Sequence, residues 1–109
     1  MGQQVKQLAV SAALLGDNLL LPATAGVLYR VMAYTLVASA GLVVQWKNGA
    51  GGTALSGPMT LVTGIALAPP PNPKDTALIE TTAGNALNLN LSVATQVSGH
   101  LTYVQETTP

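Results

Sequence analysis

The feature that most constrains the fold is a series of short apolar segments, most of them bounded by Gly, Pro, Asn or Asp, that recur at intervals of about ten residues. The clearest is Leu87 to Leu91, in which Leu alternates with Asn. A period of two is what a strand with one buried face requires, and many short, evenly spaced strands are typical of a sandwich or barrel. The sequence therefore predicts an all-β chain, folded as an antiparallel β-sandwich of jelly-roll type with seven to nine short strands.

The expected strands cover residues 3–15, 19–21, 27–37, 42–47, 53–55, 59–67, 77–82, 87–91 and 96–105. Residues 3–15 are ambiguous, because their Ala and Leu content favours a helix while Val5 and Val10 favour a strand, which we prefer. Residues 16–18 and 48–52 are expected turns, and the Pro-rich residues 68–75 an expected surface loop. We expect one domain over residues 1–109, with 1–25 as an extended N-terminal arm or edge strands.

The segment 27–37 is apolar on both faces of a regular strand. A strand that is apolar on both sides in so small a protein implies that something else covers the second face. We therefore expect that face to form a subunit interface. Arg30 lies alone on it and needs a carboxylate or carbonyl partner, which an ion pair across the interface would supply. The residues of this candidate interface are Arg30, Met32, Tyr34 and Leu36.

Charged residues make up only 7% of the chain, with 4 Lys and Arg against 4 Asp and Glu, for a formal net charge of zero. Such a chain lacks the basic surface that binding to nucleic acid requires, so no nucleic-acid partner is expected. No apolar run is long enough to span a bilayer, and no membrane partner is expected. Because few charges keep copies apart, we expect a homo-oligomer.

The residues that carry chemistry are few and scattered. The sequence has no cysteine, which excludes disulfides and thiolate chemistry. His100 has no second His, Cys or carboxylate at the spacing of a metal site, and the four carboxylates fall in separate segments. We therefore expect no enzyme, no catalytic residue, no metal and no cofactor.

Two readings remain open for the polar and aromatic residues that a binding site could use. Trp46 either stacks on a sugar ring or fills the core beside Leu42 and Val44. Asn88 and Asn90 either contact a glycan or form a solvated or subunit-facing surface. Trp46, Asn88 and Asn90 are therefore the candidate glycan contacts.

The run Thr81-Thr82-Ala83-Gly84-Asn85-Ala86-Leu87-Asn88-Leu89-Asn90-Leu91-Ser92 and the following residues 97–104 resemble the C-terminal half of a group of small β-rich virion proteins of tailed bacteriophages. The segments 29–38, 43–47 and 55–61 follow the order found in that group, so the resemblance covers about residues 27 to 104. Its most specific element is Ala-Gly-x-Ala-Leu-Asn-Leu-Asn-Leu-Ser. The chain departs from the group at Leu78 and Ile79, where a bulky aromatic is expected.

This resemblance implies a virion structural protein, in particular a capsid decoration or cement protein without an active site. Its implied location is the capsid surface, and its implied partners are the major capsid protein and further copies of itself, most simply as a trimer. The alternative is a carbohydrate- or receptor-binding module of a phage tail. The position within the virion and the face that contacts the shell stay open.

Overall fold

A computed structural model of the chain describes residues 5–49, 52–70 and 77–107. The fold is all-β, and the described residues contain no helix. In these described ranges, nine strands form two antiparallel sheets. The strands are β1 (Val5–Ala12), β2 (Gly16–Leu21), β3 (Val27–Ala38), β4 (Leu42–Asn48), β5 (Thr53–Ala54), β6 (Met59–Leu61), β7 (Ile79–Glu80), β8 (Leu87–Leu91) and β9 (Val97–Thr107).

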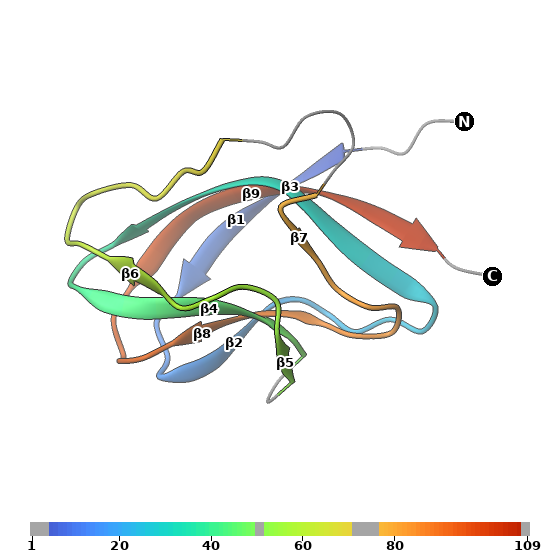
Figure 1. Cartoon of the computed structure of the whole chain (residues 1–109), viewed down its shortest axis with the longest axis horizontal. Coiled ribbons are helices and arrows are strands. Elements are labelled where there is room, and N and C mark those ends of the chain that lie inside the picture. Colours follow the sequence, from blue (N-terminus) through green and yellow to red (C-terminus); the bar gives the residue numbers. More distant parts are fainter. Residues whose placement is uncertain (1–4, 50–51, 71–76, 108–109) are drawn as a thin grey trace.

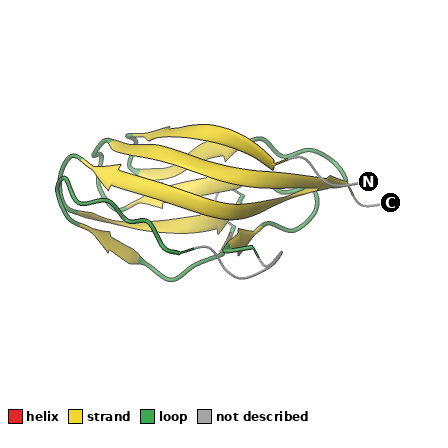
Figure 2. Ribbon diagram, turned by 90° about the horizontal axis from the view of Figure 1, so that it is seen from above, coloured by secondary structure: helices red, strands yellow, loops and turns green. Residues whose placement is uncertain are grey.

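The strand order is that of a jelly roll. The first sheet has the order β1-β9-β3-β7, and the second has β2-β8-β4-β5, with β6 also paired to β4. β1 pairs with β9, β2 with β8, β3 with β7, and β4 with β5 and β6, so the chain is one long hairpin rolled into two layers. Figures 1 and 2 show the two layers stacked face to face. The predicted fold class is confirmed.

The core lies between the two sheets and consists mainly of aliphatic residues, together with Trp46, Tyr29 and Tyr34. On β8 the three Leu residues are fully buried, as the Leu-Asn alternation predicts. On β4 the buried residues are Leu42, Val44 and Trp46, again every second position. Every second side chain of such a strand points toward the other sheet. These inward side chains pack against each other and hold the two layers together.

A β-bulge in β3 corrects the expectation that this strand is apolar on two faces. The register of β3 against β9 shifts between Val31 and Ala33, so Met32 is an extra residue on β3. Before the bulge the odd positions point inward, and after it the even positions do. One extra residue reverses which positions face the core. The buried residues are Val27, Tyr29, Val31, Tyr34, Leu36 and Ala38.

The first turn also differs from its prediction. Residues 3–15 were expected to be a strand, and β1 confirms this over Val5–Ala12; residues 3 and 4 lie outside the described part. The turn, however, lies at residues 13–15, and β2 already begins at Gly16. The buried Asn18 explains the shift, because its side-chain amide donates to the carbonyl oxygen of Leu14 (2.9 Å) while its Oδ1 accepts from the Leu14 amide (3.2 Å).

Three other expected strands also need correction. The segments 59–67 and 77–82 contain only the short strands β6 and β7. The last strand is not interrupted at Ser98-Gly99, and β9 runs through both residues. A Cβ on Gly99 would overlap the carbonyl oxygen of Thr35 on β3, so glycine marks a close approach of two strands rather than a break. Positions 50–51 of the expected turn and 71–75 of the expected loop lie outside the described residues.

Candidate functional site

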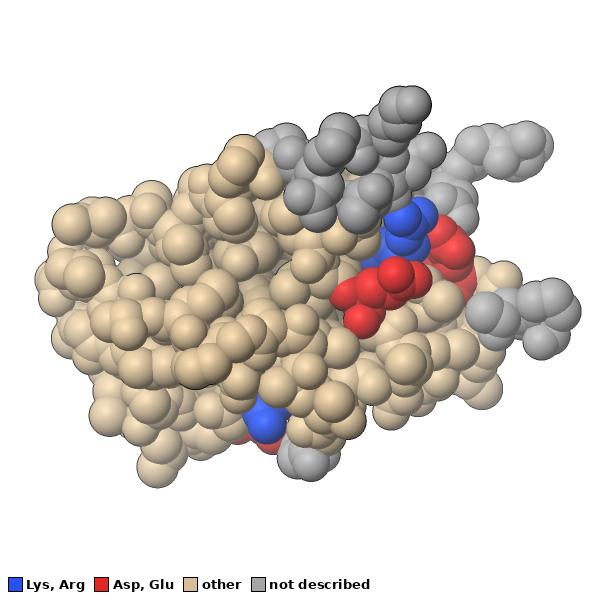
Figure 3. Space-filling view, viewed as in Figure 1, with Lys and Arg blue, Asp and Glu red and all other residues tan. Residues whose placement is uncertain are grey.

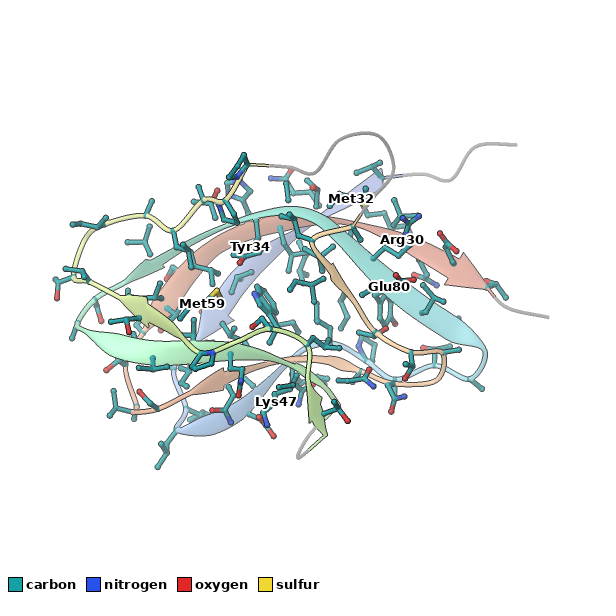
Figure 4. All side chains as sticks on the ribbon, viewed as in Figure 1. Arg30, Met32, Tyr34, Lys47, Met59 and Glu80 are labelled. Atoms are coloured by element: carbon teal, nitrogen blue, oxygen red, sulfur yellow. The ribbon has the colours of Figure 1, made fainter. Side chains whose placement is uncertain are left out.

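Arg30 has a partner within its own chain. Its Nη1 donates to Oε2 of Glu106 over 2.9 Å, and the two side chains are 19% and 28% exposed. Arg30 on β3 stands opposite Val104 on β9 and opposite Glu80 on β7, so the pair lies on the outer face of the first sheet. Figure 4 shows Arg30 and Glu80 together, far from β6. The expectation that Arg30 needs a carboxylate is met by Glu106 of the same chain, and an ion pair across a subunit interface stays a prediction.

The other three residues of the candidate interface do not share one surface. Tyr34 and Leu36 follow the bulge and point into the core, where their exposed fractions are 6% and 0%. The Tyr34 hydroxyl contacts the Met59 sulfur at 3.5 Å, and its ring meets Trp46 edge to face. Figure 4 shows Tyr34 and Met59 turned toward each other. Met32, in contrast, is partly exposed. Because Tyr34 and Leu36 are buried in the core, we remove these two residues from the candidate interface.

The candidate glycan contacts are not available to a ligand either. Trp46 is fully buried and Asn88 is only 3% exposed. Trp46 therefore takes its core reading, and its Nε1 has no acceptor among the described residues. Asn90 is half-buried and donates to Oδ1 of Asp17 on β2 over 2.7 Å. A sugar cannot stack on a buried indole, so Trp46, Asn88 and Asn90 do not form the predicted glycan site together.

The polar residues of the Thr81 to Ser92 run hold turns and strand ends in place. Thr81 is buried, and its Oγ1 accepts from the Tyr29 amide at 2.9 Å. Asn48 on β4 accepts from the Thr82 amide at 3.1 Å and donates to the Thr82 hydroxyl at 2.9 Å, while Asn85 donates to the same hydroxyl at 2.6 Å. These bonds tie the turn after β4 to the turn before β8. The run therefore has a structural role in this fold.

The ionisable side chains of the described residues come from several strands. His100 is exposed on β9, Asp17 accepts from Asn90, and Glu106 accepts from Arg30. Within the part of the chain that the structure describes, no group of three or more His, Asp or Glu residues is arranged to hold a metal. Over the same residues, no helix is long and apolar enough to cross a membrane.

The exposed aliphatic side chains gather at one end of the sandwich, which we call the apolar end. It consists of four segments: residues 13–15, 39–41, 62–68 and 92–96. Of the seven large hydrophobic side chains that are exposed in the described residues, five lie here: Leu14 (69%), Leu15 (68%), Val62 (55%), Ile65 (62%) and Val93 (45%). None of the four segments contains a charged residue or a histidine.

Strand pairing and backbone hydrogen bonds bring these four segments together. Ala12, just before residues 13–15, and Ala38, at the end of β3, both pair with Val97 on β9, and Ala38 also bridges to Thr63. The Ser39 amide donates to Gln96 oxygen (3.0 Å), and the Gly64 amide donates to Ala38 oxygen (3.1 Å). In Figure 3 the surface over β6 and residues 62–68 shows no charged side chain, whereas charges gather around β7. The molecule thus has an uncharged end and a charged end.

Sequence reasoning missed the apolar end because its residues are far apart along the chain. Each segment alone is a short apolar loop, and scattered surface hydrophobics are normal. The signal that could have found it is the presence of large aliphatic residues such as Leu14, Val62 and Val93 in these loops, whereas the connections at 22–26, 49–52 and 81–86 contain none. That contrast becomes meaningful only when the strand order shows that the loops meet.

No protein-family model matches the chain, and no curated protein matches it significantly. A solved structure from Bacillus endospore appendages, a novel family of disulfide-linked pili, is similar in fold with a TM-score of 0.54. The match covers 100% of this chain and 93% of that chain, at 9% sequence identity. At this identity the likeness shows the fold.

Proposed function

We propose that this protein is a non-enzymatic structural subunit that associates with further copies of itself. The observation that carries the proposal is the apolar end: four loops that hold five exposed aliphatic side chains and no charge. Covering these side chains removes apolar area from water, which is favourable, and exposed apolar side chains gathered in one region are typical of contact sites. Two copies that meet there bring no like charges together.

The fold likeness supports the same role. The similar structure comes from Bacillus endospore appendages, which form a family of disulfide-linked pili. We extend self-assembly and a surface location to this chain as a proposal. The linkage must differ, because this sequence contains no cysteine. Association here would be non-covalent, carried by apolar contact and backbone hydrogen bonds.

A finer form of the proposal places the protein on a phage capsid. The Ala-Gly-x-Ala-Leu-Asn-Leu-Asn-Leu-Ser run supports a tailed-phage virion protein that decorates or cements the shell, as a trimer bound to the major capsid protein. The test is to add the protein to shells that lack it. Bound protein that raises the rupture temperature of the shells supports this form, whereas shells that bind none would remove it and leave self-assembly to be judged separately.

The apolar end is tested by the double variant Leu14→Ser/Leu15→Ser. Both side chains are more than two-thirds exposed, so the variant should fold as the original does. We expect self-association in sedimentation velocity to weaken about tenfold or more, because each removed leucine contributes apolar area. The matched control is Leu19→Ser, an equally exposed leucine on β2 outside the apolar end. Equal behaviour of the two variants would contradict the proposal.

A further inference from the structure

A single two-fold contact through the apolar end joins only two copies. An assembly of more than two subunits therefore needs a second contact on each chain. The edges of the two sheets can provide one, because an edge strand presents unpaired backbone N–H and C=O groups.

β1 is the open edge. It lies at the end of its sheet, and among the described residues no strand pairs with its outer side. The register of β1 against β9 runs from Val5 to Ala12 without a shift, so the edge is eight residues long and has no bulge. It contains no proline and one charge, Lys6. An edge of this kind presents unpaired N–H and C=O groups that can bind another strand.

The other edges are shorter or irregular. β7 and β5, at the far ends of the two sheets, have two residues each. β2 has a register shift between Leu19 and Leu21 and carries Asp17. Short strands, bulges and charges are the features by which proteins protect their edges. β1 has the fewest of them.

We propose that β1 pairs antiparallel with β1 of a second copy, about a two-fold axis at Ala9, to join the two first sheets into one of eight strands. This inference rests on the proposed self-assembly and names the surface that performs it. A two-fold axis perpendicular to the sheet keeps the inner faces of both copies on the same side. Residues directly opposite each other then have their side chains on the same face of the joined sheet. The axis must therefore pass at a residue position and not between two residues.

The side chains of β1 suit this register. On the inner face Leu8, which is partly buried against the core, meets Val10 of the second copy, and Lys6 meets Ala12 instead of another Lys. On the outer face Gln7 meets Ser11, and Ala9 meets itself. The second copy therefore completes the burial of Leu8 and brings no like charges together.

Pairing through β1 places the two apolar ends at opposite extremities of the dimer. In an antiparallel pair the two apolar ends point in opposite directions, because each lies beyond Ala12 at the end of β1. The dimer then carries an apolar end at each extremity. Two different two-fold contacts on one chain, one at β1 and one at the apolar end, build an extended assembly from identical subunits.

The residue on the axis supplies the test, because it meets its own copy. Ala9 is exposed in the single chain, so Ala9→Glu and Ala9→Lys should each fold normally. We expect each variant alone to associate about tenfold or more weakly, since like charges stand directly opposite. An equal mixture of the two should recover association. The neutral control is Ala9→Gln, which keeps the length of the Glu side chain without its charge.

Cross-linking gives an independent readout. The sequence has no cysteine, so Ala9→Cys adds a single thiol that, on the axis, faces the same thiol of the second copy within disulfide reach. We expect a covalent dimer on mild oxidation, and much less from Gln7→Cys, whose partner is Ser11. Failure of the Glu and Lys mixture to recover association, or equal cross-linking from positions 7 and 9, would overturn the β1 pairing.

These outcomes are separable from the failure of the proposed function. If Leu14→Ser/Leu15→Ser weakens association while the Ala9 variants leave it unchanged, self-assembly stands and the β1 pairing is wrong. If the unmodified protein is monomeric at all concentrations, both are wrong.

Discussion

Single residues decide how closely the strands of the first sheet approach. Gly99 on β9 faces Leu36 on β3, and a Cβ at this position would overlap the backbone carbonyl of Thr35. Its φ of +151° is also one that residues with side chains rarely adopt. The neighbouring atom belongs to the backbone, so it cannot rotate away as a side chain would.

We therefore expect Gly99→Ala to lower the free energy of unfolding by about 2 to 4 kcal/mol, measured by urea denaturation. Gly57→Ala is the matched control. Gly57 is exposed and has nothing within 4 Å of the added Cβ, so its substitution should change stability by less than about 0.5 kcal/mol. Similar small effects at both positions would show that the two strands are further apart than described.

The Arg30–Glu106 ion pair belongs to the single chain and should contribute modestly. The side chains are partly exposed, and a pair of this kind typically contributes about 1 kcal/mol or less. A double-mutant cycle with Arg30→Met and Glu106→Gln should give a coupling of that size that falls as salt is added. Met keeps an aliphatic stem over the buried Val104. If Arg30→Met abolished self-association, Arg30 would instead belong to a subunit interface.

At the scale of elements, the bulge at Met32 determines what the long strand β3 presents to the core. Val31 and Tyr34 are both buried although they are three positions apart, and only an extra residue between them allows this in a strand. The strand thus buries one continuous apolar face, and its outer face is half-exposed.

Deletions test this directly. Deletion of Met32 removes the bulge but keeps Val31 and Tyr34 on the inner face, so we expect a folded protein with a moderate loss of stability. Deletion of Thr35 instead turns Leu36, which is fully buried, to the outside. We expect that variant to lack a cooperative unfolding transition in circular dichroism. If the Thr35 deletion were the better folded of the two, the assigned bulge would be wrong.

The sequence predicts this fold well wherever burial follows a strict period of two. The Leu87 to Leu91 alternation and the even positions of 42–47 indicate their buried faces correctly, because the local pattern and the core agree. The bulge was missed because both faces of 27–37 are apolar, so no residue type marks the change of phase. The candidate interface failed for the same reason, since Tyr34 and Leu36 could be placed inside or outside only once the register of β3 was known.

At the scale of the whole molecule, the distribution of charge is uneven. The described ion pair lies on the outer face of the first sheet, and the opposite end is made of four loops without charge. Association through such an end is driven by burial of apolar area, which salt does not screen. Assembly held by ion pairs would instead weaken as salt is added.

The central claim, self-association through uncharged surface, is tested most directly by sedimentation velocity of the unmodified protein. The series would extend from nanomolar to tens of micromolar concentration, in low salt and again in molar sodium chloride. We predict oligomers that grow with concentration and persist, or become more stable, in molar salt. A monomer at every concentration, or oligomers that dissociate in high salt, would contradict the claim.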